Sequence, residues 1–330
     1  MKVAQLWRFP VKSMGGTAVD AVRIDRRGVH ADRLWAVRDV EKGVTASARR
    51  VPALLGCCAR YIDEPGDDAG PGNVPGVVVT FPDGRELDGA DPAVNDALSD
   101  LVGREMRLVA LPPARDTSMH RMSAQESMSN FSAAQVRQDL NLSDTDALPD
   151  TSMFTTRQIM TLARYTTPPG TFVDLSPVHL LSTASLRDLA AGGTPYDVRR
   201  FRPNVLVDVG EDGAYPEFAW VGGEVDLGAV RLRVINQTIR CVVPTRPQPG
   251  IERDTALSRQ LAARTDRFLG VYADVATPGV VTVGDDVRVR LPLKPGAVKR
   301  ATSAATKTAT RGVQRVLEAT VLRGTALHRI

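Results

Sequence analysis

Three short stretches of the sequence combine cationic side chains with hydroxyl or amide groups at the ends of expected strands or at turns. They are Lys12-Ser13 followed by Asp32-Arg33, the stretch from Asp174 and Ser176 to Arg202 and Asn204, and the stretch from Asn236 to Arg240 and Cys241. Arginine can contact a phosphate through two N–H groups, and lysine supplies a point charge. Serine and asparagine can bind the edges of a heterocycle. Together these stretches predict a site for a large, polar ligand that carries phosphate.

Cys241 stands in the third stretch, directly after Arg240. A neighbouring guanidinium favours the thiolate form of a cysteine, which is the form that ligates metals or attacks sulfur. Most single cysteines in such a setting are nevertheless small, buried hydrophobic residues. The residue types alone therefore leave both interpretations of Cys241 open.

The remaining cysteines and the histidines exclude two common metal centres. Cys57 and Cys58 are adjacent and no CxxC motif occurs, so we expect no structural zinc site. A plant-type 2Fe–2S cluster needs four thiolates, whereas this chain has 3 cysteines. The 4 histidines are scattered and form no metal-ligand spacing.

Short strands separated by turns dominate the regions around these stretches. Alternating or β-branched residues predict strands at 3–7, 18–25, 34–39, 77–81, 106–110, 178–181, 204–209, 225–227, 230–235, 270–275, 280–283 and 287–291. Helices are expected after Asp91-Pro92, from Ser182 to Leu189 and at about 254–263. The sequence has no GxGxxG, Walker or HExxH motif. The pattern predicts a mixed α/β, β-rich fold of barrels or curled sheets.

A chain of 330 residues is long enough for two packed domains. Composition divides it into an N-terminal β-barrel-like domain at 1–110, an insertion or linker at 111–171, a second β-rich domain with small flanking helices at 172–292, and a basic tail at 293–330. The insertion is rich in methionine and in polar residues, and prolines stand at both of its ends. It is expected to be either a mobile linker or a lid over the site.

Charge and hydropathy exclude other classes of protein. The formal net charge is +4 and aromatic residues make up 5% of the chain, so we expect no nucleic-acid binding. No stretch approaches the ~20 apolar residues of a membrane span, and the N-terminus lacks the pattern of a signal peptide. We therefore expect a cytoplasmic protein. The basic tail favours weak binding to an anionic surface or, more commonly, a solvated terminus.

The order of the motifs resembles that of the MOSC family. The motifs are Lys12-Ser13 at a strand exit, Asp32-Arg33, an RxxP motif from Arg49 to Pro52, an SxASL motif from Ser182, an FRPN motif from Phe201 and the Arg240-Cys241 pair. The resemblance is greatest to members with an N-terminal β-barrel domain, such as the mitochondrial amidoxime-reducing component. It covers residues 1–110 and about 172–291, and implies a MOSC β-barrel after the N-terminal barrel domain.

The resemblance also implies a cofactor and a set of contacts. In that family the cysteine that corresponds to Cys241 binds molybdenum, so the implied cofactor is molybdenum-molybdopterin (Mo-MPT). The pterin and its phosphate are expected to contact the matching positions Lys12, Ser13, Arg33, Ser176, Arg202, Asn204, Arg240 and Tyr272.

The implied function is that of a molybdenum-cofactor-dependent oxidoreductase that reduces N-hydroxylated or similar oxo-acceptor small molecules. The rival class is a molybdenum cofactor or sulfur carrier that uses a persulfide on Cys241 without reductase turnover. Some relatives carry a fused ferredoxin-like domain, for which this chain has too few cysteines. Electrons are therefore expected from a separate ferredoxin or flavoprotein reductase.

Overall fold

The computed structural model describes residues 1–130, 132–143, 146, 154, 156–211 and 213–292. The expected basic tail, 293–330, lies outside the described residues, as does part of the expected insertion. Strands outnumber helices in the described part, with 17 strands against 6 α-helices. This confirms the expected mixed α/β, β-rich fold.

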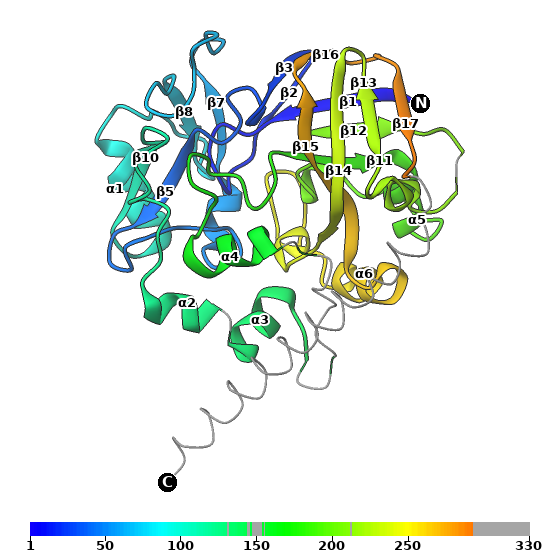
Figure 1. Ribbon diagram of the computed structural model, residues 1–330. Helices are drawn as coiled ribbons and strands as arrows, with labels where there is room; N and C mark the ends of the chain where they lie inside the picture. Colours follow the sequence, from blue (N-terminus) through cyan, green and yellow to red (C-terminus); the bar gives the residue numbers. More distant parts are fainter. Residues whose placement is uncertain (131, 144–145, 147–153, 155, 212, 293–330) are drawn as a thin grey trace.

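The largest sheet has eight strands and draws them from both ends of the chain (Figure 1). β11 and β12 run parallel, and the other neighbours are antiparallel. The strand order is β17 (Val287–Arg290), β13 (Glu224–Leu227), β14 (Val230–Ile239), β15 (Phe268–Thr277), β11 (Val178–Ser182), β12 (Val205–Asp208), β1 (Lys2–Arg8) and β2 (Thr17–Val19). The first strands of the chain therefore complete a sheet whose other strands follow residue 177.

The first strand in this order, β17, approaches β1, the next-to-last strand, at the N-terminus. Lys2 forms a β-bridge with Asp286, which directly precedes β17. The amide of Val287 donates to the carbonyl of Met1 at 3.0 Å. Figure 1 accordingly shows the N-terminus beside β17. The sheet thus curls back on itself and encloses its core.

Alternating burial explains why these segments form one sheet. Along the whole of β14, buried side chains alternate with less buried ones. This is the pattern of a strand with one face on a hydrophobic core. The enclosed core is rich in valine and leucine, including Val3, Leu6, Val207, Val225, Leu232 and Val271.

Three smaller sheets make up most of the other half of the described chain. Their strand orders are β10-β5-β6, β16-β3-β4 and β7-β8-β9. The strands are β3 (Ala21–Asp25), β4 (Gly28–Val29), β5 (Trp35–Asp39), β6 (Val44–Thr45), β7 (Cys58–Tyr61), β8 (Val77–Thr80), β9 (Glu86–Asp88), β10 (Met106–Ala110) and β16 (Gly279–Thr282). β16, near the C-terminal end of the described chain, pairs with β3, near its N-terminal end. This pairing connects the two halves of the described structure. The expected strand at 18–25 is divided between β2 and β3.

Six α-helices cover these sheets and their ends. They are α1 (Ala93–Val102), α2 (Ala124–Asn130), α3 (Ala133–Leu140), α4 (Thr156–Arg164), α5 (Thr183–Leu189) and α6 (Ala256–Thr265). Four 3₁₀ helices also occur, η1 (Pro52–Gly56), η2 (Val198–Arg200), η3 (Pro216–Trp220) and η4 (Val243–Thr245). α5 lies where a helix was expected, and Ser182 caps it, because its hydroxyl accepts the amide of Ser185 at 3.1 Å.

The helices α2, α3 and α4 come from the expected insertion and lie together at one end of the strands (Figure 1). They are attached to the main body by polar contacts. The carbonyl of Asp139, in α3, accepts the amide of Val242 at 2.9 Å. The side-chain amide of Gln158, in α4, donates to the side chain of Asn236 at 3.1 Å. The insertion therefore packs beside the end of β14, next to Cys241.

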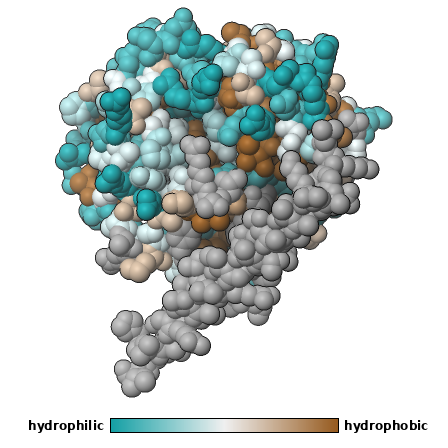
Figure 2. All heavy atoms as spheres, viewed as in Figure 1, coloured by the Kyte–Doolittle hydropathy of each residue, from teal (hydrophilic) through white to brown (hydrophobic). Residues whose placement is uncertain are grey.

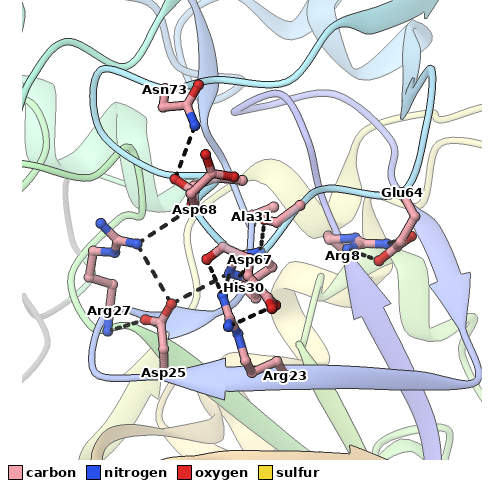
Figure 3. Close-up of polar contacts among 12 residues, drawn as sticks. Arg8, Arg23, Asp25, Arg27, His30, Ala31, Glu64, Asp67, Asp68 and Asn73 are labelled. Atoms are coloured by element: carbon pink, nitrogen blue, oxygen red, sulfur yellow. Dashed lines mark hydrogen bonds and ion pairs between the residues drawn. The ribbon is translucent and has the colours of Figure 1, made fainter.

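The Gly/Pro/Asp-rich loop between β7 and β8 is held by ion pairs (Figure 3). Arg8 donates two hydrogen bonds to the carboxylate of Glu64, at 2.8 and 2.7 Å. Arg23 donates to the carboxylate of Asp67 at 3.0 Å and to its carbonyl at 2.7 Å. These contacts fix the loop against β1 and β3.

Hydrophilic side chains cover much of the face seen in Figure 2, and hydrophobic ones gather there in small, separate patches. Among the described residues, no helix has both the length and the apolar character needed to cross a membrane.

Candidate functional site

Three of the predicted site residues adopt a left-handed backbone conformation. The φ angle is 73° at Ser13, 52° at Arg33 and 54° at Arg202. For residues other than glycine such angles cost on the order of 1–3 kcal/mol each, and they are concentrated at functional sites. All three residues lie at turns next to strands, and the side chains of two of them, Arg33 and Arg202, belong to the cluster described next.

Asp174 joins two of the predicted cations. Its carboxylate contacts the ammonium group of Lys12 and, at 3.0 Å, Nη1 of Arg33. The Lys12 side chain is 4% exposed and that of Asp174 is 60% exposed. Nζ of Lys12 also donates to the carbonyl of Phe172 at 3.2 Å. The first two motif stretches of the sequence therefore meet at Asp174.

The protonation of this group follows from burial and from the neighbouring charges. Burial lowers the pKa of the Lys12 ammonium, and Asp174 partly offsets this. Desolvation favours the neutral form of Asp174, but Lys12 and Arg33 outweigh it and hold the pKa of that carboxyl well below its usual range. Two cations therefore face the Asp174 carboxylate, and the buried carboxylate of Asp32 also lies 3.6 Å from Nε of Arg33.

Arg202 extends the positive charge and retains a free donor. Its guanidinium lies over the ring of Phe9, 4.3 Å from the ring centroid, and its Nη1 donates to the carbonyl of Met14 at 2.6 Å. Its Nη2 is buried and has no hydrogen-bond partner among the described residues. Burial and the nearby Arg33 lower the pKa of Arg202 to about 10, so the side chain is still charged at neutral pH. Arg202 and Phe9 line a pocket together with Gln248, whose side-chain Nε2 also lacks a partner there.

Arg240 is held almost entirely by neighbouring protein groups. Its Nε donates to the carbonyl of Leu269 at 2.8 Å, and its Nη1 donates to that of Phe201 at 3.0 Å. Its Nη2 donates to Leu269 and to Nε2 of His179, at 2.5 and 2.6 Å. These contacts use four of the five N–H groups of the arginine, which leaves one N–H group on Nη1 for another partner. Arg240 is therefore a buried, oriented cation with little capacity for direct ligand contact.

Cys241 is half-buried beside this cation. Burial raises the pKa of its thiol, and the charge of Arg49 opposes the rise more than that of Arg240 does. Arg240 favours the thiolate as expected, but its guanidinium is directed toward carbonyl groups, and burial outweighs its effect. A bound metal ion would favour the thiolate instead.

The other predicted residues differ in how closely they join this cluster. The Tyr272 ring packs on that of His179, 5.5 Å between centroids, and burial raises the pKa of its phenol to about 12. The Ser13 hydroxyl accepts the amide of Ala48 at 2.8 Å, directly before Arg49. The Asn204 side chain accepts the amide of His179 at 3.1 Å and so joins strands. Ser176 is 8% exposed, and among the described residues no hydrogen bond links it to the rest.

Three residues that lie in or beside the cluster were not among the predicted site residues. Asp174 belongs to a motif stretch but was not predicted as a site residue, although an acidic residue among several cations indicates a shared ion-pair partner. Arg49 was quoted only as part of the RxxP motif. Asp139 had no signal, because it lies in the insertion, where the resemblance is weakest. Its carboxylate contacts Arg49 at 3.2 Å and Arg50 at 3.4 Å.

This arrangement suits an anionic ligand. Lys12, Arg33 and Arg202 are cationic and largely desolvated. The buried Nη2 of Arg202 lacks a hydrogen-bond acceptor among the described residues, whereas Nε of Arg33 has a longer ion pair with Asp32 at 3.6 Å. Buried donors are normally satisfied, and phosphate oxygens are strong acceptors for arginine. The residues therefore fit a phosphate-bearing group, and the nearby Cys241 offers it a sulfur ligand.

Comparison with known proteins gives two domain matches and a relative of known name. The family model of the MOSC N-terminal beta barrel domain matches residues 1–88, and that of the MOSC domain matches residues 168–288. Mitochondrial amidoxime-reducing component 1 of Mus musculus is 27% identical over 311 residues, which is 86% of this chain and 81% of that protein.

Two solved structures are also similar. The YuaD protein of Bacillus subtilis has a TM-score of 0.40 at 12% identity, over 88% of this chain and 96% of that one. YiiM of Geobacillus stearothermophilus has a TM-score of 0.26 at 16% identity, over 37% and 56%. Scores this low add nothing to the fold, so the assignment depends on the two domain matches, which together cover more than half of the 330 residues. The chain therefore belongs to the MOSC-domain family, with a MOSC N-terminal beta barrel domain ahead of its MOSC domain.

Proposed function

We propose that this protein binds a molybdenum–pterin cofactor through the Lys12–Arg33–Arg202 cluster and Cys241, and that it reduces N-hydroxylated or similar oxo-acceptor small molecules. The observation that carries the proposal is a set of buried cations, including the unpartnered Nη2 of Arg202, beside the half-buried thiol of Cys241. A buried donor without an acceptor costs about 1–3 kcal/mol, so a bound anion would stabilise the site.

The chain's own residues divide the work of binding. Lys12, Arg33 and Arg202 would neutralise and orient the phosphate end of the cofactor, and Cys241 would ligate the metal. Within the described ranges, no three His, Cys, Asp or Glu side chains converge to hold a metal ion. A metal at Cys241 would therefore take its other ligands from the cofactor and the substrate. When bound, the molybdenum–pterin group supplies the electron- and oxygen-transfer chemistry, while the protein positions it and controls access.

The relatives support the type of reaction. The mouse relative is named for amidoxime reduction and aligns over most of both chains. Amidoximes are N-hydroxylated compounds, and a reductase of this type needs an electron source. We propose a separate ferredoxin or flavoprotein reductase as the donor, because the chain has only 3 cysteines. A cytoplasmic location is part of the same proposal, although the mouse relative is named as mitochondrial.

Metal and pterin analysis of the purified protein, combined with turnover, tests the proposal. The wild type should contain stoichiometric molybdenum and pterin and should reduce an aromatic amidoxime when reduced methyl viologen supplies the electrons. Cys241→Ser should lose both molybdenum and turnover. Cys57→Ala is the control, because Cys57 is buried in a separate core and its pKa is raised to about 12.

Each alternative has its own result. Sulfane sulfur on Cys241 without metal would assign the protein to the carrier class. If the protein holds the cofactor at full occupancy but reduces no N-hydroxylated substrate, it is a cofactor-binding protein without turnover. Molybdenum-dependent turnover that survives in Cys241→Ser would refute the role of that thiol.

A further inference from the structure

His179 lies where four of the predicted cofactor residues meet. It is in β11, and its side chain is 5% exposed. Its ring contacts Arg240, the carbonyl of Arg202 and the ring of Tyr272. Its backbone amide donates to the side chain of Asn204. In the sequence it resembled an ordinary core histidine, since it stands between apolar residues of a strand.

The two ring nitrogens of His179 have distinct roles that the neighbours determine. Arginine has only N–H donors, so Nε2 must accept from Nη2 of Arg240 at 2.6 Å. Nδ1 then carries the proton and donates to the carbonyl of Arg202 at 3.3 Å. Burial and the charge of Arg240 keep the pKa of His179 well below its ordinary value, so the ring is neutral. One imidazole thus connects Arg240 to the left-handed turn at Arg202.

The neighbouring strand leaves space for this contact at Gly270. Its φ is +76°, and a Cβ there would lie 2.5 Å from Nε2 of His179 and 2.6 Å from the carbonyl of Leu180. Any other residue would be strained at this φ and would displace the imidazole from Arg240. The glycine of the FLGVY stretch therefore allows the His179–Arg240 contact.

We propose that His179 is a positioning residue for the anionic end of the cofactor. It fixes the carbonyl of the Arg202 turn on one side and the guanidinium of Arg240 on the other, so that the two cations act as one unit. This inference depends on the proposed function for the identity of the ligand, but its test uses inorganic phosphate and needs no turnover.

The variants separate the two contacts of the ring. His179→Leu removes both. His179→Gln retains an oxygen that can accept from Arg240, and His179→Asn retains an N–H that can donate to Arg202. His120→Leu is the matched control, because His120 is also buried but contacts Thr167 and Gly170, both within the insertion. Apoprotein stability in urea and the rise in melting temperature with added phosphate are measured for each.

We expect phosphate to bind His179→Leu about tenfold more weakly than wild type, equivalent to ~1.4 kcal/mol. His120→Leu should keep wild-type phosphate affinity at a comparable loss of stability, and His179→Gln should recover part of the binding. Equal phosphate affinity in wild type and in all three His179 variants would overturn the proposal. If His179→Leu does not fold, the Gln and Asn variants carry the same comparison.

The inference and the proposed function can fail separately. If the wild type contains no molybdenum or pterin but its phosphate binding depends on His179, the proposed cofactor is wrong and the positioning role of His179 stands. A wild type with full cofactor whose His179 variants retain full pterin content and phosphate affinity would refute the positioning role alone.

Discussion

Replacing Asp174 by asparagine should weaken the apoprotein and strengthen its binding of phosphate. The carboxylate is the shared partner of Lys12 and Arg33, whose side chains are 4% and 9% exposed. Without it, Lys12 loses its carboxylate partner, Arg33 retains the longer pair with Asp32 at 3.6 Å, and the two largely buried cations repel each other. A phosphate ion can then replace the missing negative charge. Stability and anion affinity should therefore change in opposite directions.

The size of the stability loss lies between two limits. Exposed ion pairs contribute about 0–1 kcal/mol, and removal of one partner from a fully buried pair costs about 3–5 kcal/mol. Here the cations are buried, but the Asp174 side chain is 60% exposed, so solvent screens the interaction. We expect a loss of about 1–3 kcal/mol in the free energy of unfolding at pH 7.

The pH dependence of stability provides a second check on the predicted loss of unfolding free energy in Asp174→Asn. The pKa of Asp174 is lower in the folded protein than the ordinary value of 3.8. Its contribution is therefore fully present above pH 3.8 and is lost as the pH falls toward the folded pKa. The difference in stability between wild type and Asp174→Asn should stay constant from pH 8 to about 5 and shrink only in more acidic solution.

Urea unfolding of the apoprotein, with and without phosphate, measures both effects. Asp286→Asn is the control, because Asp286 forms an exposed ion pair with Lys2 and should show no such behaviour. The reasoning is refuted if Asp174→Asn unfolds like wild type at pH 7 and gains no more stability from phosphate than wild type does.

Three further predictions concern the cover of the site, the insertion and the electron source. Asp139→Asn should speed alkylation of Cys241 by iodoacetamide, because Asp139 holds α3 to Arg49 and Arg50; an unchanged rate would argue against α3 as a cover. Burial lowers the pKa of His120 from 6.5 to about 4. Wild type should therefore lose about 2–3 kcal/mol of unfolding free energy as the pH falls between these values, and His120→Gln should not. Unfolding curves measured across this pH range test the prediction. Purified protein should not oxidise NAD(P)H by itself and should turn over when a flavoprotein and ferredoxin are added; direct oxidation would contradict a separate donor.

Local features of the fold were predictable, and distant pairings were not. Alternation located β10 and β14, and the Ser182 cap located the start of α5. Alternation identifies a strand but not its partner, because pairing depends on the burial of whole faces. The sequence therefore could not show that β1 pairs with β12, or that β16 leaves its neighbour β15 to pair with β3.

The site was predictable in its residue types but not in its contacts. The cations at 12, 33 and 202 were found from their motifs, and Lys12 and Arg33 meet at Asp174. The direction of the Arg240 side chain was not predictable, because it depends on the space left by Gly270 and on the carbonyl of Leu269. For the same reason the role of His179 became visible only in the folded chain.

X-ray absorption at the molybdenum edge tests the central claim most directly. Wild-type protein and Cys241→Ser are loaded with cofactor and compared for the number of sulfur atoms bound to the metal. If Cys241 is the protein ligand, the variant either fails to hold molybdenum or holds it with one sulfur fewer and an oxygen in its place. An unchanged sulfur count in a variant that binds stoichiometric molybdenum would contradict the account.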